Sequence, residues 1–121
     1  MGFRFQTLNI YTGTLRISEE IFIIVRGLQS KRQYSFADQL FRACLSISNN
    51  IAEGSGSNSN KEFASYLNIA RRSLFECVNM LIILNREGIL PDSDKDRLIS
   101  ELDLLSKQIQ SLRKTLLARD S

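Results

Sequence analysis

The chain has 121 residues, of which 43% are hydrophobic and 24% are charged, and its 16 basic and 13 acidic residues give a net charge of +3. This length predicts a single domain, residues 1–121, with a core of its own. Histidine is absent, which removes the commonest general base and metal ligand, and no signal peptide or membrane-spanning apolar run is present. We therefore expect a cytoplasmic protein that does not enter a membrane and has no metal, cofactor or catalytic site.

The first predicted helix covers residues 8–29, where apolar residues recur every three or four positions in two adjacent stripes. It contains a run of five consecutive apolar residues, 21–25, which includes Ile21, Phe22 and Val25. At about 100° per residue such a run surrounds the helix, so part of it must point away from the core. Scattered surface exposure is the simple alternative. Polar residues 30–34 form the first connection.

The second predicted helix begins at Ser35, with Asp38 three residues later in a pattern that resembles a capping box, and ends at Gly54. Its apolar face includes Leu40 and Ile47. Next to that face runs a polar stripe with helical spacing, made of Gln39, Arg42, Ser46, Asn50 and Glu53.

The third predicted helix follows a short loop, residues 54–58, and starts with a second capping box formed by Ser59 and Glu62. An apolar stripe then continues to Gly88, with Pro91 just beyond. A second run of five apolar residues, 80–84, includes Met80 and Ile83. Cys44 and Cys77 fall on apolar stripes, and we interpret them as small core residues, with a disulfide or a reactive thiol as the alternatives.

The fourth predicted helix is capped by Asp92 or Ser93, and its leucines and isoleucine alternate at steps of four and three from Leu98 to Leu116, which is typical of a bundle seam. Three short connections between four amphipathic helices predict an all-α fold, an up-down-up-down four-helix bundle with a left-handed supercoil. The expected core includes Leu40, Ile47, Leu67, Leu74, Leu102, Leu105 and Ile109.

The polar stripe has two interpretations. In the structural one, a hydrogen-bonded network fixes the register between the second and third helices, with its members drawn from Gln39, Arg42, Asn50, Glu53, Glu62 and Glu76. In the functional one, the loop end of the bundle presents Asn50, Glu53, Arg42 and Arg71 to a ligand or a macromolecule. Arg71 also has Glu53 and Glu76 as potential ion-pair partners.

Several motifs of the second and third helices resemble those of a known family. They are the Q-x-x-R-A segment that starts at Gln39, the NIAEG segment of residues 50–54, Lys61-Glu62-Phe63 and Ser73-Leu74-x-Glu76. Together they resemble the 23S rRNA-intervening sequence proteins, a family related to the accessory variability determinant proteins of diversity-generating retroelements. Arg72 departs from the pattern, because members usually carry a small residue there.

The resemblance implies a four-helix bundle that assembles into a homopentameric ring and has no known enzymatic activity. The related branch associates with a reverse transcriptase and with nucleic acid. The two apolar runs, which cannot face one core entirely, predict a homo-oligomer whose subunit interface includes Ile21, Phe22, Val25, Met80 and Ile83. By analogy with the related branch, the expected partners include RNA or DNA, or a reverse transcriptase.

A pentamer would carry a charge of roughly +15, and Arg71 and Arg72 are the candidate nucleic-acid contacts. Few aromatic residues lie outside the predicted core, so we expect contacts to the phosphate backbone rather than sequence-specific readout of single strands. A protein-interaction scaffold with no role in nucleic-acid binding is the main alternative, and an enzyme or small-molecule binder is the third.

Overall fold

The computed structural model describes residues 2–120 and contains four long helices. A short 3-10 helix, η1 (Arg4–Thr7), precedes them. The predicted all-α fold is confirmed, and no β-strand occurs in the described residues. The four helices are α1 (Asn9–Ser30), α2 (Tyr34–Ser55), α3 (Asn60–Arg86) and α4 (Asp92–Arg119).

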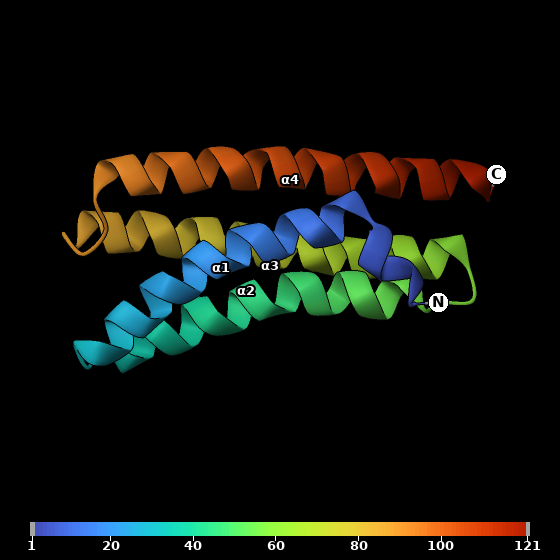
Figure 1. Cartoon of the computed structure of the whole chain (residues 1–121). Helices are drawn as coiled ribbons and strands as arrows, with labels where there is room; N and C mark the ends of the chain where they lie inside the picture. Colours follow the sequence, from blue (N-terminus) through green and yellow to red (C-terminus); the bar gives the residue numbers. More distant parts are fainter. Residues whose placement is uncertain (1, 121) are drawn as a thin grey trace.

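Each helix packs along the one before it, and consecutive helices run in opposite directions (Figure 1). The pairs α1 with α2, α2 with α3 and α3 with α4 share extensive contacts, whereas α1 and α4 touch over a shorter length. α1 and α3 lie diagonally across the bundle. The contact between α2 and α3 is the most extensive of these, and the polar stripe of α2 lies beside it.

The core consists of the apolar faces that the helical periodicity predicts. All seven residues named as core above are at most 2% exposed. In α1 the core face is formed by Ile10, Ile17, Ile21, Val25 and Leu28, so the five-residue run contributes two residues to the interior. Both cysteines are buried in the core and are free thiols, as predicted.

Two helices end in a Schellman motif, in which a residue with left-handed backbone follows the helix. After α3 this residue is Gly88, with φ of 74°, and the amide of Ile89 donates to the carbonyl of Leu84 at 2.9 Å. After α1 the same place is occupied by Arg32, with φ of 60°. The predicted end of the third helix at Gly88 is confirmed. The end of α1 has arginine instead of glycine at the left-handed position, so the sequence did not mark it.

Of the predicted helix starts, that of α3 is confirmed, because the hydroxyl of Ser59 accepts a hydrogen bond from the amide of Glu62 at 3.1 Å. The other two predicted caps are wrong. α2 begins at Tyr34, so Ser35 lies inside the helix, and α4 follows Pro91, so Asp92 is already its first residue. The carboxylate of Asp92 instead accepts a hydrogen bond from the side-chain amide of Asn85 at 2.7 Å, which ties the start of α4 to the end of α3.

Gly54 is a second correction, because it does not end α2. The helix continues to Ser55, and Gly54 is buried within it. A Cβ atom at this position would lie 2.6 Å from Cβ of Tyr66 and 3.0 Å from Cδ1 of Phe63. The glycine of the NIAEG segment therefore permits close approach of α2 and α3.

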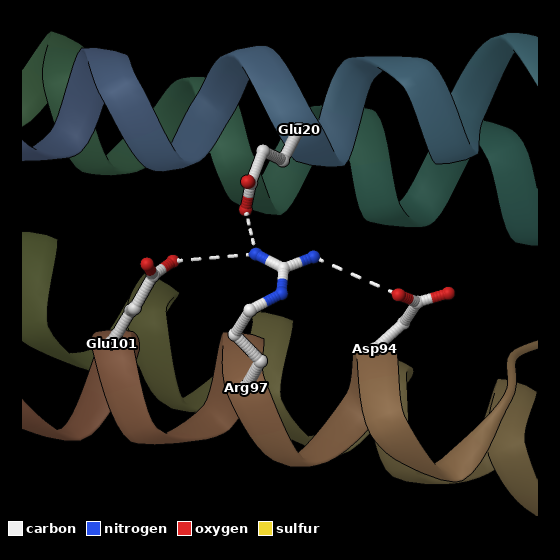
Figure 2. A network of polar contacts seen from close by, with 4 residues as sticks. All are labelled: Glu20, Asp94, Arg97 and Glu101. Atoms are coloured by element: carbon white, nitrogen blue, oxygen red, sulfur yellow. Dashed lines mark hydrogen bonds and ion pairs between the residues drawn. The ribbon is translucent and has the colours of Figure 1, made fainter.

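The thinner α1–α4 contact is supported by an ionic cluster around Arg97 (Figure 2). Its guanidinium donates to Glu20 of α1 at 2.6 Å and also lies 3.7 Å from Asp94 and 4.0 Å from Glu101 on its own helix. The hydrogen bond to Glu20 raises the pKa of Arg97. This arginine is thus held by three carboxylates and joins the first and last helices.

Candidate functional site

The α2–α3 contact contains a short chain of hydrogen bonds. The side-chain amide of Asn50 donates to the carbonyl of Ser46 at 2.7 Å and to its hydroxyl at 3.0 Å. The hydroxyls of Ser46 and Ser73 lie 2.7 Å apart across the two helices. Ser73 Oγ donates to the carbonyl of Ile69 at 3.1 Å, so Ser46 donates to Ser73 and the chain ends on a carbonyl.

This arrangement supports the structural interpretation for Asn50 and corrects it for the other residues named above. The side chains of Gln39, Arg42, Glu53, Glu62 and Glu76 are exposed and form no hydrogen bond or ion pair within residues 2–120. The reason is geometric: the α2 positions that meet α3 most closely are occupied by the small residues Gly54 and Ser46, so the longer polar side chains lie outside the contact. The long polar side chains extend into solvent instead.

On the α2 side these polar residues surround a shallow hollow of about 360 Å³, lined by Arg42, Leu45, Ser46, Asn49, Asn50 and Glu53. Ser46 and Asn50, which form the part-buried hydrogen bonds, line this hollow together with the exposed side chains of Arg42 and Glu53. Since neither charge is used within the described chain, this face of α2 is available to a partner.

Arg71 and Arg72 occupy different environments. The Arg71 guanidinium carbon lies 4.8 Å from the ring centroid of Phe75, within cation–π range. Its Nε atom is buried and has no hydrogen-bond partner in the described chain, and the predicted pairing with Glu53 or Glu76 does not occur. Arg72 is exposed. Phe75 is 54% exposed, and its location next to both arginines was not predicted.

The predicted subunit interface also needs correction. Ile21, Val25 and Met80 are at most 5% exposed, because they pack inside their own bundle and cannot contact a second copy. Phe22 and Ile83 are half-buried. The members of the two apolar runs that do reach the surface are Ile23, which is 62% exposed, and Ile82, which is 40% exposed.

The two cysteines are buried in the core as free thiols. Cys44 of α2 donates a weak hydrogen bond to Ser18 Oγ of α1 at 3.3 Å. A hydrogen bond with the Cys44 thiol, together with burial, raises the pKa of Cys77. A thiol that stays protonated is a poor nucleophile. Within residues 2–120, moreover, no three Cys, Asp or Glu side chains gather in a way that could hold a metal ion.

The charges are unevenly used. Every ion pair within the described residues takes its cation from α4, namely Lys95, Arg97 or Lys107. In the sequence, residues 1–91 hold ten basic and seven acidic residues, and residues 92–121 hold six of each. The net charge of +3 therefore comes from residues 1–91, where no described arginine or lysine forms an ion pair.

Comparison with known proteins agrees with this fold. The family model of the 23S rRNA-intervening sequence protein matches residues 6–111, which is most of the chain. The chain belongs to this family. A search of curated proteins found no match.

Among solved structures, the chain resembles a Bacteroides thetaiotaomicron protein of unknown function from the S23 ribosomal protein family. The TM-score is 0.82 at 22% sequence identity, over 87% of this chain and 98% of the other. That likeness supports the four-helix fold. The relation of the family to accessory variability determinant proteins stays a prediction.

The residues matched by the family model include the NIAEG segment and both α2 and α3, whose contact contains the hydrogen bonds of Asn50, Ser46 and Ser73. None of the described helices combines the length and the apolarity needed to cross a membrane.

Proposed function

We propose that the protein is a non-enzymatic homo-oligomer that binds nucleic acid through its phosphate backbone, as an accessory factor in a ribonucleoprotein or nucleic-acid complex. The observation that carries this proposal is the distribution of ion pairs: they all take their cation from α4, while the arginines and lysines before it have no carboxylate partner in the described chain. Unpaired, exposed arginines are the groups that hold phosphates.

Assembly would increase the effect of these charges. A net charge of +3 is small for one chain, but a ring of five chains places roughly +15 on one particle. Phosphate contacts made by several subunits release counterions together, so affinity then depends steeply on salt. The proposed partners are RNA or DNA, either free or bound by a reverse transcriptase.

The surface provides two separate apolar patches for such assembly. The α1–α2 patch consists of Phe22, Ile23 and Phe41, with the two phenylalanine rings 5.5 Å apart. The α3 patch consists of Ile82 and Ile83. The two patches are made of different residues on different helices, α1 and α2 for the first and α3 for the second.

Two different patches that bind each other form a head-to-tail contact, and repeated head-to-tail contacts close into a ring when the rotation from one subunit to the next divides a full turn evenly. Two such patches favour a cyclic assembly of left-handed up-down-up-down bundles. The family resemblance implies that this ring is a homopentamer.

Light scattering tests the assembly. We expect the wild-type protein to form an oligomer at micromolar concentration and Ile23→Asp to be a folded monomer, because an aspartate at an exposed position disrupts the contact but not the core. Leu104→Asp is the matched control: Leu104 is 58% exposed on α4, outside both patches, and this variant should keep the oligomer. A monomeric wild-type protein would contradict the proposal.

Binding of a duplex and of a structured RNA, measured by fluorescence anisotropy from about 50 mM salt upwards, tests the function. We expect binding by the wild-type oligomer that weakens steeply with salt, and much weaker binding by Ile23→Asp. The exposed Ile23 and Phe41 also suit a protein partner. An oligomer that binds neither nucleic acid at low salt would therefore leave the protein-interaction scaffold as the better account.

A further inference from the structure

The outer face of α3 carries an exposed aromatic ring, Phe75, about one helical turn after two arginines, Arg71 and Arg72. Phe75 is 54% exposed, although a phenylalanine on a well-packed bundle usually faces the core. It follows Leu74, which is buried, so the ring points out of the seam rather than into it. Its position is a consequence of the register of α3, in which the preceding residue fills the core.

Hollows lie on both sides of this ring. One, of about 350 Å³, is formed with α4 and contains Arg71, Leu74, Val78 and Ile99. The other is formed by α3 itself and contains Ile69, Arg72, Ser73 and Glu76. Phe75 lines both hollows, so the aromatic ring separates two concave surfaces, each with an arginine.

The two arginines differ in what they can offer. The Arg71 guanidinium stacks on Phe75 at 4.8 Å and its buried Nε has no partner. A buried donor without an acceptor is unusual in a folded protein. The acidic neighbour in its hollow, Asp103, is already paired with Lys107 at 3.0 Å. The positive charge of Arg71 is therefore not neutralised there, and Arg72 presents a second, exposed guanidinium.

We infer that Phe75 is a stacking platform for an unpaired base of single-stranded nucleic acid, with Arg71 and Arg72 contacting the flanking phosphates. This inference rests on the proposed function and identifies the class of nucleic acid. An exposed ring offers a π-face to any base, and adjacent arginines hold the backbone, which is how proteins bind single strands without sequence preference. A duplex keeps its bases stacked inside and cannot use the ring.

Stacking on Phe75 agrees with the expectation from the sequence that single strands are not read sequence-specifically, because every base has a π-face. Phe75 supplies one platform in each chain, and a ring of chains would repeat it around the particle.

The test uses the full-length protein and a fluorescent single-stranded RNA of about 12 nucleotides, alone and annealed to its complement. Phe75→Leu removes the π-face and keeps an apolar side chain. We expect it to weaken single-strand binding by about tenfold or more, with no change in duplex binding and no change in the salt dependence, because both arginines still reach the phosphates.

Two variants serve as controls. Phe75→Tyr keeps the ring and should bind as the wild type does. Phe3→Leu removes an aromatic ring that is 74% exposed elsewhere on the surface and should also bind normally. Light scattering on each variant shows whether the oligomer persists.

Unchanged single-strand affinity in Phe75→Leu, while the wild type binds nucleic acid, would overturn this inference and leave the proposed function standing. Loss of binding together with loss of the oligomer would also overturn it, since Phe75 would then be an interface residue. A wild-type protein that binds neither form of RNA would instead overturn the proposed function itself.

Discussion

Gly54 shows how a single missing side chain determines the distance between α2 and α3. The segment around it is α-helical, so an alanine would be favoured by helix propensity by about 1 kcal/mol. The contact with Tyr66 opposes this, because an added Cβ would lie only 2.6 Å from the tyrosine Cβ. Overpacking of this kind costs roughly 1 to 3 kcal/mol, and the steric term outweighs the propensity term.

We therefore predict that Gly54→Ala lowers the free energy of unfolding by up to about 2 kcal/mol, as measured by denaturant melts. Gly27→Ala is the matched control, because Gly27 also lies inside a helix but an added Cβ would have no neighbour within 4 Å. That variant should gain up to about 1 kcal/mol. Equal effects of the two substitutions would show that close approach is not the role of Gly54.

Asn50 and Glu53 test which residues of the polar stripe support the structure. Asn50 donates two hydrogen bonds in the α2–α3 contact, whereas the Glu53 side chain is exposed and makes none within the described residues. We predict that Asn50→Ala costs about 1 kcal/mol of unfolding free energy and that Glu53→Ala changes it by less than about 0.5 kcal/mol. Thermal melts of the two variants at equal salt provide the comparison. A larger loss of unfolding free energy in Glu53→Ala would show that the Glu53 carboxylate does stabilise the fold and would contradict this prediction.

Some of these residue roles were accessible from the sequence and others were not. Helical spacing correctly placed Asn50 beside the apolar face. Helical spacing could not show which polar residues fit into the α2–α3 contact. That depends on the distance between the two helices, which leaves room for Ser46 but not for Glu53. The exposure of Phe75 was missed for a related reason, although a signal existed: Phe75 is adjacent to a core leucine and four residues after Arg71, the spacing at which side chains on a helix meet.

At the scale of elements, the helices were predictable because helical periodicity is local. Buried residues repeat every three or four positions in all four helices, and the seam from Leu98 to Leu116 lies where the pattern placed it. Helix ends were less predictable, because serine and aspartate also occur in the first turn without capping. The two apolar runs misled for another reason: a run that surrounds a helix does not indicate which of its residues face the core.

The ends of α1 and α3 have the same geometry but different residues at the left-handed position. Glycine adopts this conformation freely, whereas other L-residues are strained by about 1 kcal/mol. We predict that Arg32→Gly raises the free energy of unfolding by up to about 1 kcal/mol, measured by denaturant melts. The reciprocal change, Gly88→Ala, places a Cβ at φ of 74° and should destabilise by a similar amount. A stabilising Gly88→Ala would contradict this view of the helix ends.

At the scale of the whole molecule, charge is divided between the helices. α4 supplies the cations of the local and α1-directed ion pairs, as the cluster around Arg97 shows (Figure 2). The helices before it leave their basic residues to solvent or a partner. The number of charges follows from the sequence, but which of them are paired depends on the rotation of each helix about its own axis, so the pairing required the structure.

The central claim, that the unpaired cations before α4 bind phosphates, can be tested by the salt dependence of binding. The measurement is the slope of log affinity against log salt for a duplex, on three proteins: the wild type, Arg72→Gln and Lys95→Gln. Each variant has one positive charge fewer per chain, but Arg72 is exposed without an ion-pair partner in the described chain, whereas Lys95 is paired with Asp96 at 2.9 Å. We predict that Arg72→Gln reduces the magnitude of the slope by about 0.9 for each phosphate that is no longer neutralised and that Lys95→Gln leaves it unchanged. Equal changes in the two variants, or a wild-type slope near zero, would contradict the claim.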